Sequence, residues 1–210
     1  MSPERPAVAG VLLAGGLSRR MGGGDKPLKP LKGQTILAHV IARVKPQVQA
    51  LVLNANGEPS RFAAFGLPVA PDVVEGFAGP LAGVLTGLEW AAEHATECLW
   101  LASFATDAPF LPADLVARLI EALEREGADL ACAASGGRHH PVFGLWPVRL
   151  KDDLHRALTQ DGVRKVDVFT ARYRLAVADF AAEPYDPFFN ANAPEDLEEA
   201  ERILQTMIAR

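Results

Sequence analysis

One segment of the chain, residues 14–34, combines glycines and basic side chains in a spacing that suits phosphate binding. Glycines at 15–16 and 22–24 lack side chains, so backbone N–H groups there can close around phosphate oxygens. The basic residues are Arg19, Arg20, Lys26, Lys29 and Lys32, opposed only by Asp25. Residues 19–32 therefore carry a net charge of +4. The rest of the chain carries −9, which gives the total of −5. A solvated basic loop is the plain interpretation, and a site for a compact, multiply charged anion is the sharper one.

This segment does not match two familiar phosphate-binding loops. A Walker loop needs Gly-Lys followed by Ser or Thr, but Lys26 follows Asp25 and precedes Pro27. A dinucleotide fingerprint beginning at Gly22 would end on Pro27 instead of a small residue. The site, if it binds phosphate, is of another type.

Composition limits the class of protein. The chain has 210 residues, of which 49% are hydrophobic and 22% charged, as expected for one folded domain. A net charge of −5 argues against a general nucleic-acid binder. The longest apolar stretch, residues 7–17, is shorter than the roughly 20 residues of a membrane span, and no basic region precedes it. We therefore expect neither a membrane segment nor a secretory signal, and a cytoplasmic location. Cys98 and Cys132 lie in apolar runs and are expected to be buried, without a disulfide or zinc role.

Apolar runs alternate with amphipathic stretches, which is typical of a sheet with helices on both faces. Strands are expected at residues 7–13, 50–54, 67–70, 98–105, 129–134, 142–146 and 173–177. Helices are expected from about 35 to Pro46, from Pro80, from Pro112 to Gly127, over 148–159 and over 194–208. Residues 14–34 contain no convincing element, and so long a connection after a strand is usually functional. The chain is predicted to form a single α/β domain over residues 1–210.

Three polar residues follow predicted strands. Asp107 ends the most hydrophobic strand, where a carboxylate can hold Mg²⁺ together with substrate phosphates; helix capping suits Asp114 better. Asn54 and Asp72 also lie at strand ends, but as sequence alone they could equally form turns. Lys26 suits a triphosphate, and Arg19 or Arg20 can grip phosphate oxygens in bidentate fashion.

Two further groups lie in the second half. Asn190 and Asn192 are two residues apart, which would place both amides on one face of an extended segment, although turn formation before Pro194 is an alternative. His139 and His140 follow Gly136-Gly137-Arg138 in what reads as a polar loop that could bind a phosphate. Metal binding by this histidine pair is disfavoured because no Cys or carboxylate lies at ligand spacing.

The pattern LAGG-x-SRRMGG-x-DK, residues 13–26, resembles the signature of nucleotidyltransferases of the molybdenum cofactor guanylyltransferase type. The resemblance runs along nearly the whole chain. Its further blocks are Asn54-Ala55-Asn56, Gly79-Pro80-Leu81-Ala82-Gly83, residues 106–112 (TDAPFLP), His140-Pro141 and residues 190–197 (NANAPEDL). The glycine loop and the strand-end aspartate are shared with sugar-phosphate nucleotidyltransferases, so those two features alone would indicate only the reaction class.

The resemblance implies a Rossmann-like, three-layer α/β domain of the GT-A-like type with a mostly parallel central sheet. Residues 1–112 would mainly bind the nucleotide and residues 113–210 the acceptor. The residues implied to be catalytic are Lys26, Arg20 and Asp107, with Asp107 the metal ligand. Those implied to bind GTP are Leu13, Ala14, Gly15, Gly16, Gly23, Lys26, Asn54, Asp72 and Asp107. Those implied to bind the acceptor are Asn190, Asn192 and His140.

The activity implied is Mg²⁺-dependent transfer of GMP from GTP to Mo-molybdopterin, with release of pyrophosphate. Molybdoenzyme apoproteins or their chaperones would then be partners. A cytidylyltransferase acting on the same pterin is the nearest alternative, but that branch tends to carry Ala-Ala-Gly where this chain has Ala14-Gly15-Gly16. A non-catalytic cofactor chaperone is a second alternative, which Lys26 and Asp107 disfavour.

Overall fold

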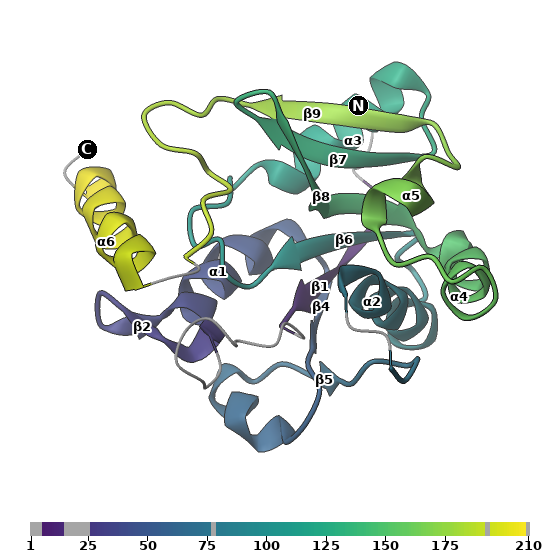
Figure 1. Ribbon diagram of the computed structural model, residues 1–210, viewed down its shortest axis with the longest axis horizontal. Helices are drawn as coiled ribbons and strands as arrows, with labels where there is room; N and C mark the ends of the chain where they lie inside the picture. Colours follow the sequence, from purple (N-terminus) through teal and green to yellow (C-terminus); the bar gives the residue numbers. More distant parts are fainter. Residues whose placement is uncertain (1–5, 15–25, 77–78, 192–193, 209–210) are drawn as a thin grey trace.

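The computed structural model describes residues 6–14, 26–76, 79–191 and 194–208. Within them, seven strands form a sheet in the order β5-β4-β1-β6-β8-β7-β9. Figure 1 shows these strands fanning from β5 to β9. The strands are β1 (Val8–Leu13), β4 (Ala50–Asn54), β5 (Val69–Ala70), β6 (Trp100–Ala105), β7 (Leu130–Ser135), β8 (Arg138–Pro147) and β9 (Leu175–Phe180).

The sheet is mostly parallel, as the sequence predicts. β1 pairs in parallel with β4 and β6, β4 with β5, and β7 with β9. β8 runs antiparallel to both of its neighbours. The continuous apolar runs arise because the central strands are covered on both faces, which β1 illustrates with five consecutive buried residues.

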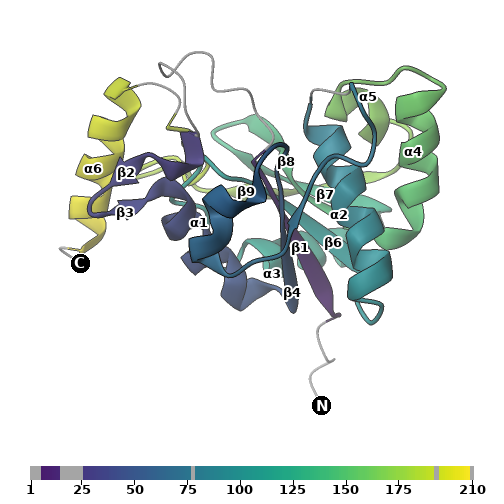
Figure 2. The same ribbon diagram turned by 90° about the horizontal axis from the view of Figure 1, so that it is seen from below.

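Helices cover both faces and complete three layers. α1 (Ile36–Val44) and α3 (Leu115–Glu126) lie on one face of the sheet. α2 (Pro80–His94), α4 (Lys151–Thr159) and α5 (Val166–Thr170) lie on the other, as Figure 2 shows. α6 (Pro194–Ile208) lies outside these layers, at one end of the molecule.

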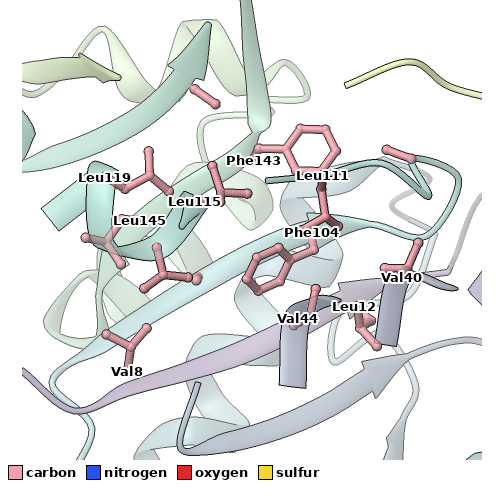
Figure 3. Packing of buried hydrophobic residues seen from close by; sticks show 14 of the residues in the cluster. Val8, Leu12, Val40, Val44, Phe104, Leu111, Leu115, Leu119, Phe143 and Leu145 are labelled. Atoms are coloured by element: carbon pink, nitrogen blue, oxygen red, sulfur yellow. The ribbon is translucent and has the colours of Figure 1, made fainter. Parts of the chain in front are cut away.

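Separate apolar clusters fill the two interfaces. On the α1 and α3 face, Leu12 of β1, Val44 of α1 and Phe104 of β6 belong to one cluster (Figure 3). On the α2 face, Val11 of β1 and Leu85 of α2 belong to another. Residues adjacent in β1 thus point into opposite cores, which holds the strand rigidly in place.

The strand order reverses between β1 and β6. The chain passes from β1 outward through β4 to β5 and then returns to the other side of β1 as β6. Such a reversal is where open α/β sheets bind ligands, beyond the carboxyl ends of the strands. Thr106, directly after β6, donates its hydroxyl hydrogen to the carbonyl of Leu13 at 3.1 Å, bridging the two strand ends.

Several elements differ from their predicted form. The predicted polar loop at His139 and His140 is wrong, because β8 begins at Arg138 and includes both. Residues 26–35 hold a short 3-10 helix (Lys26–Leu28) and a two-stranded hairpin, β2 (Pro30–Leu31) and β3 (Gln34–Thr35), where no element was expected. The turn between these strands uses positive φ at Lys32 and Gly33.

The helix expected from Pro112 begins later, at Leu115. Asp114 is its N-cap residue, but the Asp114 side chain makes no capping bond; Gln47 Oε1 instead accepts from the Val116 N–H at 3.0 Å. The predicted stop at Gly127 is confirmed, with that glycine in the left-handed region. Short helices at Lys45–Gln47, Pro59–Phe65 and α5 were not predicted, because none is long enough to show a helical period. The helix predicted over 148–159 begins as a 3-10 helix at Val148–Leu150 and continues as α4.

α6 packs through a cluster of its own. Ala200, Ile203 and Leu204 contact a group that includes Leu31 of β2 and Phe110, just after β6. The C-terminal helix is thereby tied to the hairpin that follows Lys26. Among the described helices, none has the length and apolar character that a membrane crossing requires.

Candidate functional site

An ion pair joins the two residues that the sequence singles out most strongly. Lys26 Nζ lies 2.5 Å from Asp107 Oδ2, across 81 positions of the chain. Lys26 begins the 3-10 helix after the glycine-rich segment, and Asp107 follows β6. The two side chains are 14% and 23% exposed, so the pair is shielded but remains open to solvent.

The backbone and amide of the 190–191 segment fix the other side of Asp107. In the amide orientation that satisfies both groups, Asn190 donates to Asp107 Oδ1 at 3.2 Å and to the Phe188 carbonyl at 3.3 Å. The Ala191 N–H donates to the Asp107 carbonyl at 3.0 Å. Asp107 thus connects the nucleotide half predicted for residues 1–112 with the acceptor half predicted for 113–210.

A second polar cluster lies at the end of β4. Asn54, only 2% exposed, donates through Nδ2 to Asp72 Oδ1 at 2.9 Å, and Asn56 donates to Asp72 Oδ2 at 2.8 Å. Asn56 Oδ1 accepts from the Asp72 N–H at 2.9 Å. Asn54 therefore does not serve a local turn. Its amide orients a partly exposed carboxylate whose remaining lone pairs can accept hydrogen bonds from a ligand.

Gly83 of α2 explains why the Gly79–Gly83 block needs glycine at its end. A Cβ at Gly83 would overlap Oδ1 of Asn54 and lie 2.6 Å from Leu13 Cδ2. The helix consequently approaches β1 and β4 closely at their carboxyl ends. Thr86, one turn on, accepts from the Val73 N–H at 3.2 Å and so anchors the segment that carries Asp72.

Backbone groups of Leu13 and Ala14, which are predicted to contact the nucleotide, already make hydrogen bonds within the protein. The Ala14 N–H donates to the Asn54 carbonyl at 2.9 Å, and the Leu13 carbonyl accepts from Thr106. Gly15, Gly16, Arg19, Arg20 and Gly23 lie outside the described residues, as does Asn192.

The third cluster surrounds His140 at the same edge of the sheet. His140 Nε2 lies 2.8 Å from Ser135 Oγ, which donates to Asp186 Oδ1 at 2.7 Å. Asp186 Oδ1 also accepts from the Phe188 N–H at 2.9 Å. Burial lowers the pKa of His140, reinforced by the charges of Arg138 and His139, although the Asp186 carboxylate acts in the opposite direction.

A bulge in β8 places this histidine. Cys132 of β7 pairs with Gly144, but the next residue, Ala133, pairs with His140, so residues 141–143 of β8 have no paired partner. Ser103 of β6 stabilises the bulge: its hydroxyl donates to the Val142 carbonyl at 2.6 Å and accepts from Trp146 Nε1 at 2.8 Å. Bulges commonly redirect side chains beside active sites.

Sequence reasoning missed Ser103, Ser135, Asp186 and Phe188. Both serines lie in apolar strands as small residues, where a hydroxyl carries no local sign of its partner. Asp186 lies in an irregular segment, where aspartate is common. The Asn190 and His140-Pro141 blocks pointed to this region, but not to these four residues.

The described residues contain no group of three or more His, Cys, Asp and Glu side chains that could hold a metal ion. A substrate-assisted Mg²⁺ site needs less, because one or two carboxylates suffice when phosphates supply further oxygens. Asp107 fits this requirement. Its Oδ2 already accommodates a cationic group, and its Oδ1 is oriented by an amide.

The chain is similar to known proteins over nearly its full length. It is 61% identical over 202 residues to a molybdenum cofactor guanylyltransferase from Bradyrhizobium sp. (strain ORS 278), covering 96% of this chain and 95% of the relative. A protein of the same name from Rhodopseudomonas palustris (strain BisB5) is 58% identical, covering 95% of each chain.

Solved structures share the fold. Molybdopterin-guanine dinucleotide biosynthesis protein A from Archaeoglobus fulgidus superposes with a TM-score of 0.72 at 23% identity, covering 94% of this chain and 99% of that one. Residues 10–174 match the MobA-like NTP transferase domain. The chain therefore belongs to the MobA-like NTP transferase family.

Proposed function

We propose that this protein is a molybdenum cofactor guanylyltransferase, which transfers GMP from GTP to the terminal phosphate of Mo-molybdopterin. The high identity to relatives of that name supports the assignment. The observation that carries it in the molecule is the Lys26–Asp107 pair beyond the carboxyl ends of β1 and β6, linked through Asn190 and Phe188 to the cluster around His140. The products are the guanine dinucleotide form of the cofactor and pyrophosphate.

GTP is proposed to bind over the carboxyl ends of β1 and β4. Its triphosphate would draw the Lys26 ammonium away from Asp107, because three phosphates offer more negative charge than one carboxylate. Asp72, oriented by Asn54 and Asn56, would accept hydrogen bonds from the nucleoside. Leu13, Ala14, Gly15, Gly16 and Gly23 remain proposed nucleotide contacts, and Arg20 a proposed phosphate ligand.

Mg²⁺ is the proposed cofactor, with Asp107 as its protein ligand. When bound, the ion offsets phosphate charge and orients the triphosphate. Release of Asp107 by Lys26 frees Oδ2 for this role, so one displacement prepares both residues. Asn190 keeps the carboxylate oriented during the exchange through its bond to Oδ1.

The transfer itself requires no protein nucleophile. An oxygen of the acceptor phosphate forms a bond to the α-phosphorus, the bond from that phosphorus to the bridging oxygen of the β-phosphate breaks, and pyrophosphate leaves with the electron pair. Lys26 stabilises the negative charge that develops on the phosphate oxygens. Asn190, Asn192 and His140 are proposed to bind the acceptor on the far side of Asp107.

The substrates also suggest where the protein acts and what it meets. We propose a cytoplasmic location, and molybdoenzyme apoproteins or their chaperones as recipients of the product.

A nucleotide competition assay tests the function. The protein is incubated with Mg²⁺, molybdenum-loaded molybdopterin and equal GTP and CTP, and pyrophosphate and dinucleotide products are measured. We expect the guanine dinucleotide to dominate. Equal turnover of CTP would overturn the base assignment, and GTP binding without pyrophosphate release would support a cofactor chaperone instead.

A further inference from the structure

A buried hydroxyl connects His140 to a carboxylate that has no assigned role. Ser135, at the end of β7, is 2% exposed, and its Oγ lies within hydrogen-bond distance of both His140 Nε2 and Asp186 Oδ1. The three residues come from β7, β8 and the segment after β9. Because the serine is sealed from solvent, its single hydrogen has only these two partners to choose between.

The placement of hydrogens in this chain follows from the donor inventory. An aspartate carboxylate has no hydrogen to give, so the Ser135 hydroxyl must donate to Asp186. The serine oxygen then offers only a lone pair towards His140, and Nε2 must carry a hydrogen to bond it. Since burial lowers the pKa of His140, the neutral ring is favoured at pH 7. In a neutral ring with hydrogen on Nε2, Nδ1 is a bare acceptor.

Packing fixes the ring as firmly as the hydrogen bonds do. The His140 ring centroid lies 4.7 Å from that of Phe188, which also contacts Phe143 and Phe180. The Phe188 N–H donates to the same Asp186 oxygen that holds Ser135. His140 is nevertheless partly exposed, and Nδ1 has no hydrogen-bond partner within the described parts of the chain.

The same segment links His140 to the proposed reaction centre. The Phe188 carbonyl accepts from the Asn190 amide, which also donates to Asp107. A substrate that extends from Asp107 past residues 188–190 would therefore approach the ring of His140, which packs against Phe188. This is the side on which the acceptor is proposed to bind.

We propose that Ser135 and Asp186 are positioning residues, which hold His140 with Nδ1 as a hydrogen-bond acceptor for a ring N–H group of the acceptor substrate. The inference rests on the proposed function, because the acceptor is taken to be a reduced pterin, whose ring edge carries N–H donors. It also changes the ligand first expected at this histidine. A nitrogen lone pair without hydrogen repels the oxygens of a phosphate dianion. His140 would therefore bind the pterin ring, and other groups would bind the phosphate.

Nitrogen NMR tests the tautomer directly. Long-range ¹H–¹⁵N correlation of the labelled full-length protein distinguishes a ring nitrogen that carries hydrogen from one that does not, and His140→Gln identifies the signals among the five histidines. We expect hydrogen on Nε2 in the wild type. Ser135→Ala should allow the tautomers to mix. Hydrogen fixed on Nδ1 in the wild type would overturn the proposal.

Asp186 offers a matched pair of variants. Ser135 and the Phe188 N–H both donate to Oδ1 of this side chain, so the amide oxygen of Asp186→Asn can accept both hydrogen bonds and should preserve the tautomer. Asp186→Ala removes the acceptor and should mix the tautomers as Ser135→Ala does. Loss of the tautomer in Asp186→Asn together with its retention in Asp186→Ala would contradict the hydrogen assignment.

Ligand titrations separate the ring from the phosphate. Tetrahydrobiopterin, a reduced pterin without phosphate, should shift the Nδ1 signal, whereas inorganic phosphate should not. An Nδ1 signal that does not shift with the pterin, or that shifts only with phosphate, would contradict binding of the pterin ring by His140. This experiment does not require turnover, so its failure is distinguishable from failure of the proposed guanylyl transfer.

Kinetics supply a second readout. With molybdenum-loaded molybdopterin, Ser135→Ala should raise the KM for the acceptor about 3- to 10-fold, as expected for one weakened hydrogen bond, without changing the KM for GTP. Asp186→Asn should keep the KM for the acceptor close to the wild-type value, whereas Asp186→Ala should raise it. Equal changes for both substrates would indicate a merely structural role.

Discussion

Lys26 and Asp107 neutralise each other at 2.5 Å, although a phosphate and a metal ion are the partners that each is proposed to bind. The pairing has a physical reason. A partly shielded carboxylate and ammonium are each costly to leave without a counter-charge, so the protein without its ligands satisfies one with the other. In the proposed function, Mg²⁺ would supply a cation for Asp107 and GTP an anion for Lys26. We therefore expect the two ligands to bind together more favourably than either alone.

Replacing Lys26 with alanine should weaken GTP binding by at least tenfold, because the proposed triphosphate contact is lost while Asp107 still repels phosphate oxygens. Isothermal titration with GTP and Mg²⁺ measures the change. Lys45→Ala is the matched control: it removes the same charge from the exposed end of α1, which precedes the start of β4 at the opposite edge of the sheet. Equal affinities for Lys26→Ala and wild type would remove Lys26 from the nucleotide site.

Asp107→Asn should lower kcat on the order of 10²-fold, since the amide keeps the shape but loses the negative charge that a metal requires. The loss should be partly recovered at high Mg²⁺ if the ion's affinity is what the charge supplies. Pyrophosphate release at a series of Mg²⁺ concentrations gives both quantities. Asp152→Asn, on the exposed surface of α4, should behave as wild type. Unchanged kinetics in Asp107→Asn would contradict the assignment.

Gly83→Ala should reduce both stability and GTP affinity. The added methyl group would displace the Asn54 side chain, which orients Asp72, and overpacking of this kind costs about 1–3 kcal/mol. Gly87→Ala provides the comparison, because its methyl group meets Val11 and Leu101 side chains instead. Both variants should unfold earlier in urea, but only Gly83→Ala should bind GTP more weakly. Loss of affinity in both would mean that general destabilisation explains the effect.

The layers of the fold could be predicted from the sequence because each buried face produces a regular spacing of apolar residues. The continuous run at β1 and the 3.6-residue period of α1 and α2 are direct consequences of the faces they bury. Asp107 was predictable for a related reason: it follows the most apolar strand, and strand ends in parallel sheets share an edge. Asn54 and Asp72 were also expected at strand ends, but their mutual hydrogen bond became apparent only in the structure.

Side chains whose role depends on a partner distant in the sequence show no such pattern. Ser135 looks like any small residue of an apolar strand, and only the tertiary fold brings it to Asp186. His140 was assigned to a loop because Gly136-Gly137 and Pro141 are typical of turns. In the structure, the glycines form the β7–β8 turn through positive φ, while Pro141 lies in the bulge, where no ladder hydrogen bond is needed.

The two cysteines should be inert in the native protein at neutral pH. Burial raises the pKa of Cys132 to about 11, and burial together with Glu97 raises that of Cys98. Because the thiolate is the reactive form, little of either exists below pH 8. Iodoacetamide labelling followed by intact mass should show no adduct in native protein and two adducts in guanidinium. Rapid labelling of the native protein at pH 7 would show that the cysteine that reacts is not buried.

Acidification should destabilise the protein in a way that depends on His140. Burial lowers the folded-state pKa of this residue below the ordinary value of about 6.5. Above that value the ring is neutral in both states and contributes no pH dependence. As the pH falls through it, the unfolded chain takes up a proton that folded His140 resists, so unfolding is favoured. The melting temperature should therefore drop between pH 7.5 and pH 5.5, and the drop should be smaller in His140→Gln. An identical slope in His140→Gln and wild type would show that the pKa of His140 does not differ between the folded and unfolded states.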